Sequence, residues 1–93
     1  MLFISLSTFS QEDTVRINSQ LSPEQMAEQD YNSGLRAMES KDFNTAADLF
    51  SRCLAAKPGF DKALANRAIA FTRLKKYNEA LADINLAISA NPA

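Results

Sequence analysis

Apolar residues recur every three or four positions through residues 22–93, the spacing that places them on one face of a helix. Short breaks containing polar residues, proline or glycine divide this pattern into four stretches. The pattern therefore predicts four helices and no strand in this part of the chain. Because the predicted connections are only a few residues long, neighbouring helices are expected to run antiparallel. The predicted helices cover about residues 22–39, 43–56, 60–74 and 77–90.

The ends of these stretches carry capping signals. Ser22 and Gln25 have the spacing of a capping box, in which each side chain binds the backbone N–H of the other. Pro23 suits the first helical position, because the N–H that proline lacks would be unpaired there. Asp42 is a candidate cap for the second helix, and Pro58 cannot continue that helix. The signals therefore support both the number of helices and their ends.

The chain also resembles itself at an offset of 34 residues. Identical pairs at this offset include Asn32 and Asn66, Asn44 and Asn78, Ala46 and Ala80, Ala56 and Ala90, and Pro58 and Pro92. Other pairs keep size and polarity, such as Phe50 and Ile84. A sustained period of this length is typical of stacked repeats, which build surfaces more often than reaction centres.

The small and bulky residues of the repeat have predictable packing roles. Gly34 is expected to let the second helix of its hairpin approach closely. Phe50, Phe71 and Ile84 are expected to fill the space between the two hairpins. A single hairpin leaves one apolar face in water, so each hairpin needs a neighbour.

Residues 27–60 and 61–93 each resemble one tetratricopeptide repeat, a pair of helices with a set spacing of small, bulky and proline residues. The matching residues are Gly34, Ala46, Phe50 and Pro58 in the first repeat, Ala80 and Pro92 in the second, and, by size class, Leu64, Ala68, Phe71 and Ile84. The residues that depart from the family's pattern are Asp30, Ser33, Ala37 and Arg67. The resemblance implies an all-α fold for residues 22–93, in which two helix-turn-helix hairpins stack as a short right-handed α-solenoid.

Proteins of the tetratricopeptide repeat family line a concave groove with the first helix of each hairpin, and the groove holds a peptide or another protein. The resemblance thus implies a protein–protein interaction module, a scaffold or adaptor. An enzyme is not predicted, because the chain has no histidine and its residues form no catalytic set. The groove residues that it implies are Tyr31, Leu35, Met38, Glu39, Ala65, Asn66, Ile69, Thr72 and Arg73. An exposed apolar face of this kind is expected to need a partner.

Two alternatives remain open. Asn66-Arg67 resembles the asparagine–arginine pair with which some members of the family clamp acidic C-terminal tails of chaperones, which would make this chain a co-chaperone-like receptor. Tyr31 and Leu35 stand where such clamps carry lysine and asparagine, so Asn66 is predicted to bind a neighbouring backbone instead. The second alternative is a purely structural role within a longer repeat array. The apolar face would then pack against residues 1–21, further repeats or a second copy, and self-association is predicted because two repeats fall below the usual three.

Composition argues against several other functions. The net charge is −1 and the pI is about 5.3, without the basic excess of nucleic-acid-binding domains. The chain has no histidine, which removes the usual base near neutral pH and the commonest metal ligand. Its one cysteine, Cys53, forms no internal disulfide and is expected to be a small core residue, because its counterpart is Ala87. No cofactor or metal is predicted, and no apolar run is long enough to span a bilayer.

Residues 1–21 differ from the rest and are predicted to form an N-terminal tail. Their first part is an apolar, serine-containing stretch with the small residue Ser10 at its end, which is typical of the hydrophobic part of a secretory signal peptide. The basic residues that precede such a stretch are missing. Export to a bacterial periplasm or cell envelope is therefore one hypothesis for localisation, and the cytoplasm is the other.

Overall fold

The computed structural model describes residues 21–91, and every element in this range is a helix. The helices are α2 (Pro23–Glu39), α3 (Phe43–Ala56), α4 (Asp61–Arg73) and α5 (Tyr77–Ala90). All four predicted helices are confirmed; α2 begins one residue later than predicted, and α4 is one residue shorter at each end. The predictions for the apolar N-terminal stretch and its export lie outside the described residues.

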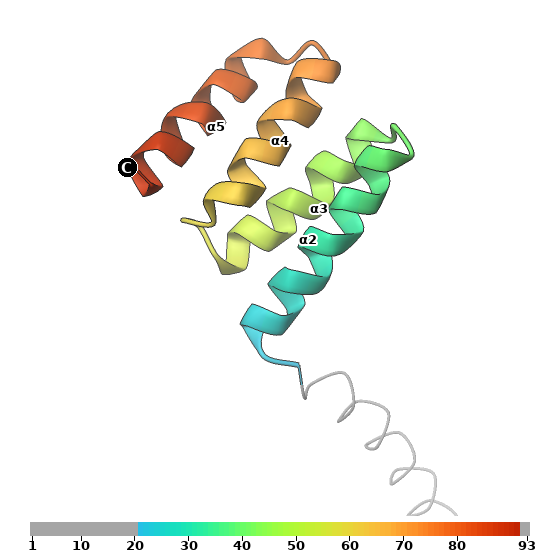
Figure 1. Ribbon diagram of the computed structural model, residues 1–93, viewed down its shortest axis with the longest axis vertical. Helices are drawn as coiled ribbons and strands as arrows, with labels where there is room; N and C mark the ends of the chain where they lie inside the picture. The colour runs from blue at the N-terminus through green and yellow to red at the C-terminus, as the bar shows by residue number, and fades with distance from the viewer. Residues whose placement is uncertain (1–20, 92–93) are drawn as a thin grey trace, which may run out of the picture.

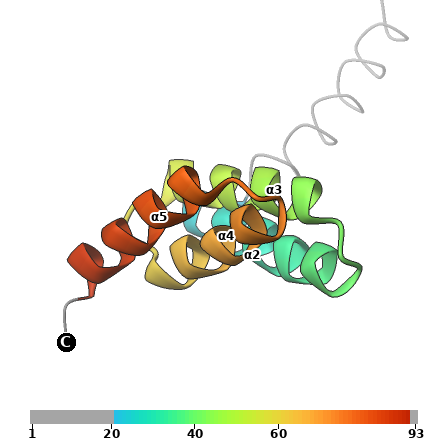
Figure 2. The ribbon, with the colours of Figure 1, turned by 90° about the horizontal axis from the view of Figure 1, so that it is seen from above.

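The four helices form two hairpins that stack side by side (Figure 1). α2 packs on α3, α4 packs on α5, and α3 packs against α4 to join the hairpins. Figure 2 shows α2 and α4 in one layer and α3 and α5 in the other. The predicted all-α stack of helical hairpins is therefore confirmed, with the first helices of the two hairpins on a shared face.

The helix starts follow the capping signals in the sequence. The Ser22 N–H donates to Gln25 Oε1 at 2.8 Å, and the Gln25 N–H donates to Ser22 Oγ at 3.1 Å, which confirms the capping box. Asp42 Oδ1 accepts from the Thr45 N–H at 3.3 Å and caps α3 as predicted. Each such cap contributes about 1 kcal/mol to stability.

The turns of the two hairpins have the same backbone geometry. Lys41 and Lys75, which are 34 positions apart, are the two non-glycine residues with positive φ in the described part of the chain, at 62° and 63°. In each turn the next amide donates back to a carbonyl in the last turn of the preceding helix, at 2.9 Å from Asp42 and 2.8 Å from Lys76. This is the Schellman arrangement that ends many helices. The sequence repeat is therefore also a repeat of backbone conformation.

The core lies between the first hairpin and α4. Phe50 of α3 and Ala63 of α4 are inaccessible to solvent, and Leu64 of α4 is almost so. Cys53 belongs to the same cluster, as predicted from its alanine counterpart. Burial raises the pKa of the Cys53 thiol, the charge of Asp30 adds to this rise, and Lys57 opposes it. The thiol therefore stays protonated near neutral pH and acts as a small apolar residue.

Gly34 of α2 packs against the ring of Phe50 of α3. A β-carbon added at Gly34 would lie 2.6 Å from Cε1 of the Phe50 ring, well inside van der Waals contact. The predicted role of Gly34 in close helix approach is confirmed.

The prediction that Ile84 fills the space between the hairpins is wrong. Ile84 is 43% exposed, and the outer side of α5 carries further exposed apolar residues. In the first hairpin the corresponding face of α3 is covered by α4, whereas no other described helix packs on the outer face of α5. Helical spacing showed correctly which residues share a face but could not show whether that face is covered.

Candidate protein-interaction site

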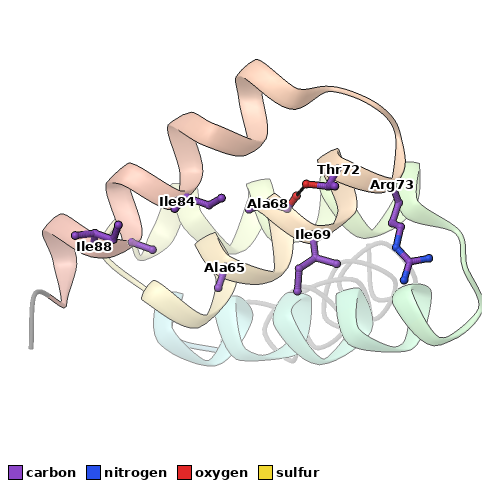
Figure 3. Close-up of a pocket in the computed structure, with 8 residues that line it drawn as sticks. Ala65, Ala68, Ile69, Thr72, Arg73, Ile84 and Ile88 are labelled. Carbon is purple, nitrogen blue, oxygen red and sulfur yellow. Dashed lines mark hydrogen bonds between the residues drawn. The ribbon is translucent and has the colours of Figure 1, made fainter.

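An apolar hollow of about 370 Å³ lies between α4 and α5 of the second hairpin (Figure 3). Its lining residues are Ala65, Ala68, Ile69, Thr72 and Arg73 of α4 and Ile84, Ala87 and Ile88 of α5. The Thr72 hydroxyl donates to the Ala68 carbonyl oxygen at 2.8 Å, so its proton is already used within α4. The hollow therefore offers hydrophobic contact with few polar groups for orientation.

The hollow is the counterpart of a surface that α4 covers in the first hairpin. Ile69, Ile84 and Ile88 correspond, 34 positions earlier, to Leu35, Phe50 and Leu54. Phe50 and Leu54 are buried, and Leu35 is partly buried against the cluster that contains α4 residues. In the first hairpin this face is covered by α4. Within residues 21–91, no helix covers the equivalent face of the second hairpin.

Four of the nine predicted groove residues meet at this hollow. They are Ala65, Ile69, Thr72 and Arg73, all from the second repeat. The hollow also needs Ile84, Ala87 and Ile88 of α5, which the sequence analysis did not include. The 34-residue offset could have indicated these three residues, since it aligns them with residues of α3 that α4 covers in the first hairpin.

The groove residues predicted from the first repeat lie elsewhere. Leu35 and Met38 are partly buried against the core, and Glu39 is exposed at the end of α2. Tyr31 links the hairpins, because its ring centroid lies 5.8 Å from that of Phe50 and 5.0 Å from that of Phe60. None of these four residues lines the hollow.

Asn66 is engaged in hydrogen bonds within the chain. Its Nδ2 donates to the Lys62 carbonyl oxygen at 2.9 Å and to the Tyr31 hydroxyl at 3.2 Å. The predicted bond to a neighbouring backbone is confirmed, and the structure adds the bond to Tyr31. The Asn66 amide nitrogen thus has two hydrogen-bond partners within the chain.

A bidentate ion pair fixes the two walls of the hollow relative to each other. Arg67 Nε donates to Asp83 Oδ2 at 2.7 Å, and Arg67 Nη2 donates to Asp83 Oδ1 at 2.7 Å. Arg67 Nη1 also donates to Ser51 Oγ of α3 at 2.9 Å. The Asp83 side chain is only 3% exposed. In the sequence, Arg67 stands out as a departure from the repeat pattern and as part of the Asn66-Arg67 pair, but neither feature predicts its bond to Asp83.

Charge at the hollow is concentrated at one end. Arg73 is the only charged residue in its lining, and its guanidinium carbon lies 5.5 Å from the ring centroid of Phe43. The exposed Lys75 and Lys76 follow in the turn before α5. This end of the hollow is therefore basic, whereas the remainder is apolar.

A second hollow lies on the first hairpin but has a different character. It is lined by Met26 and Ala27 together with Asp30 and Arg52, whose carboxylate and guanidinium approach to 3.3 Å. An ion pair within the lining makes this surface less suited to an apolar ligand.

Within residues 21–91, no group of three or more histidine, cysteine or acidic residues is placed to hold a metal ion. None of the helices α2 to α5 has the length and hydropathy needed to cross a membrane.

The fold and hollow define a stack of helical hairpins with one apolar face uncovered within the described residues. No family model matches the chain. Part of the chain is similar to the Protein SGT1 homolog of Oryza sativa subsp. japonica, with 39% identity over 57 residues. The aligned part makes up 61% of this chain and 16% of that protein, so the chain matches only a small part of its relative.

Proposed function

We propose that this chain is a tetratricopeptide-type interaction module, a scaffold or adaptor, that binds an amphipathic helix of a protein partner in the hollow between α4 and α5. The observation that carries this proposal is the first hairpin, whose equivalent face is filled by a helix of this same chain. Exposed apolar surface of this kind favours association, because its removal from water contributes about 25 cal/mol per Å².

The way α4 sits on the first hairpin indicates what the partner helix carries. Ala63 and Ala70 of α4 are fully buried in that contact and lie two turns apart, with Leu64 beside them. Small residues at this spacing let a helix approach closely. The proposed partner helix therefore presents an uncharged apolar face that extends over at least two turns.

Two further observations support an interaction role over catalysis. The chain has no histidine, and its one thiol is buried. The similarity to the Protein SGT1 homolog covers 16% of that protein, which is what a module shared between otherwise different proteins produces. The missing histidine and the buried thiol count against catalysis, because nucleophilic catalysis needs an activating base beside an accessible nucleophile.

Selection of helical peptides from a displayed library, with the immobilised protein at low density, tests this function. Peptides selected on the wild type are expected to bind Ile69→Glu at least about tenfold more weakly, since the substitution removes an apolar contact and brings a carboxylate into the hollow. Ile69 is 48% exposed, so the variant is expected to fold.

Met26→Glu is the matched control, because Met26 is 50% exposed and lies outside the hollow. Selected peptides should bind this variant as they bind the wild type. Equal binding to Ile69→Glu and the wild type, or loss of binding only in Met26→Glu, would contradict the proposed site.

A further inference from the structure

We infer that the helix accepted by the hollow is α5 of a second copy of this chain, which makes a two-fold symmetric dimer with the two α5 helices antiparallel. This inference rests on the proposed function, because it takes the hollow as a docking site and names its occupant.

α5 carries an apolar stripe with the spacing of a helix-pairing seam. Tyr77, Leu81, Ile84 and Ile88 follow one another at intervals of four, three and four residues, which places them on one face. They are 61%, 57%, 43% and 59% exposed. Ile84 and Ile88 also line the hollow, so the same residues belong to both the docking helix and its site. A surface that serves both as docking helix and as docking site is self-complementary, and a two-fold interface requires such a surface.

The charges on α5 allow two copies to approach. α5 has two charged residues, Glu79 and Asp83, and Asp83 is buried in its ion pair with Arg67. The four residues of the stripe are uncharged. Pairing through the stripe therefore brings no like charges into contact.

The charges at the ends of α5 favour the antiparallel orientation. Lys75 and Lys76 precede the helix, whereas its last turn contains no basic residue to offset the partial negative charge of its free carbonyls. In an antiparallel pair, the lysines of each copy lie beside the C-terminal end of the other copy's α5. Such an interaction contributes about 0.3–1 kcal/mol and occurs twice in a two-fold dimer. A parallel pair would bring the lysines of both copies together.

The polar character of α2 disfavours a head-to-tail stack. In such a stack, α2 of one copy would occupy the hollow of another, as α4 covers the first hairpin. The buried α4 residues and their counterparts in α2 are Ala63 and Gln29, Leu64 and Asp30, and Ala70 and Arg36. Burying these polar and charged side chains without partners is unfavourable. The two-fold arrangement avoids this burial.

Sedimentation equilibrium of the full chain, from micromolar to several hundred micromolar, tests the inference. The wild type is expected to show a reversible monomer–dimer equilibrium. Leu81→Glu is expected to weaken it at least about tenfold, because it places a charge in the seam. Leu86→Glu is the matched control, since Leu86 is 53% exposed on the opposite face of the same helix. That variant should dimerise like the wild type.

Cross-linking tests the orientation of the pair. In a Cys53→Ala background, a mixture of Lys76→Cys and Asn91→Cys chains is expected to yield mixed dimers with a short bis-maleimide, whereas Lys76→Cys alone yields few. Self-cross-linking of Lys76→Cys, or association that continues beyond the dimer, would overturn the antiparallel two-fold arrangement.

A wild-type chain that stays monomeric over the whole concentration range would overturn the inference about the second copy. The proposed function would stand in that case if selected peptides still bind the wild type and lose affinity for Ile69→Glu. The two experiments therefore separate failure of the dimer from failure of the docking site.

Discussion

Replacing Arg67 with methionine is expected to lower the free energy of unfolding by about 3 kcal/mol, the scale for a buried ion pair that loses one partner. The Asp83 carboxylate is 3% exposed and receives two hydrogen bonds from Arg67 at 2.7 Å. Methionine fills a similar volume but donates no hydrogen bond, so a buried charge is left unpaired. Urea denaturation followed by circular dichroism near neutral pH measures this loss.

Two variants calibrate that result. Arg52→Met removes an arginine from the Asp30 pair, in which the Arg52 side chain is 69% exposed, and is expected to change stability by less than about 1 kcal/mol. Arg67→Met/Asp83→Leu removes both charges and gives position 83 the residue of its counterpart Leu49. This double variant is expected to recover most of the loss, since apolar replacement of a buried pair is often nearly neutral. Equal losses in Arg67→Met and Arg52→Met would contradict a structural role for the pair.

Gly34→Ala is expected to destabilise the chain by about 2 kcal/mol, although alanine is the better helix former by about 1 kcal/mol. The added β-carbon would lie 2.6 Å from Cε1 and 2.9 Å from Cδ1 of the Phe50 ring. Phe50 is fully buried, so moving its ring would displace neighbouring side chains of the close-packed core. The unfolding midpoint in urea, compared with that of the wild type, measures the effect.

The second hairpin supplies the compensating change. There the counterparts of Gly34 and Phe50 are Ala68 and Ile84, so an alanine at the first position accompanies a smaller residue at the second. The double variant Gly34→Ala/Phe50→Ile is expected to lose at least about 1 kcal/mol less than the sum of the two single variants. Additive losses, or a Gly34→Ala variant more stable than the wild type, would show that the Gly34–Phe50 contact does not limit helix approach.

The helices were predictable because their signals are local. The capping box at Ser22, the Asp42 cap and the proline after α3 each act within a few residues, and the structure confirms the caps. The pairing of helices followed from the shortness of the connections. The close contact at Gly34 also followed from the repeat, because a small residue recurs at the point where two helices approach.

The Arg67–Asp83 pair could not be found from spacing along a single helix. It joins α4 to α5 across 16 residues, and the first repeat has Ser33 and Leu49 at the corresponding positions. A repeat comparison therefore shows two substitutions there and no interaction. Only the register between the two helices brings these side chains together.

The candidate site was predicted in part for a related reason. Helical spacing placed Ile69, Thr72 and Arg73 on one face of α4, and the structure confirms that they meet at one hollow. The spacing could not show that Tyr31 packs between Phe50 and Phe60, because that contact depends on how α4 lies against the first hairpin. Ile84 and Ile88 line the hollow because no other helix of residues 21–91 covers their face of α5. Helical spacing alone could not show that this face is uncovered.

Methyl NMR during titration with a selected peptide shows which face of the protein the peptide occupies. The Leu81→Glu background is expected to weaken competition from a second copy, and Leu81 lies outside the lining of the hollow. If the peptide binds in the hollow, the Ile69, Ile84 and Ile88 methyl signals are expected to shift with no change at Leu86. Shifts confined to Met26 and other residues of the first hairpin, with Ile69, Ile84 and Ile88 unmoved, would contradict it.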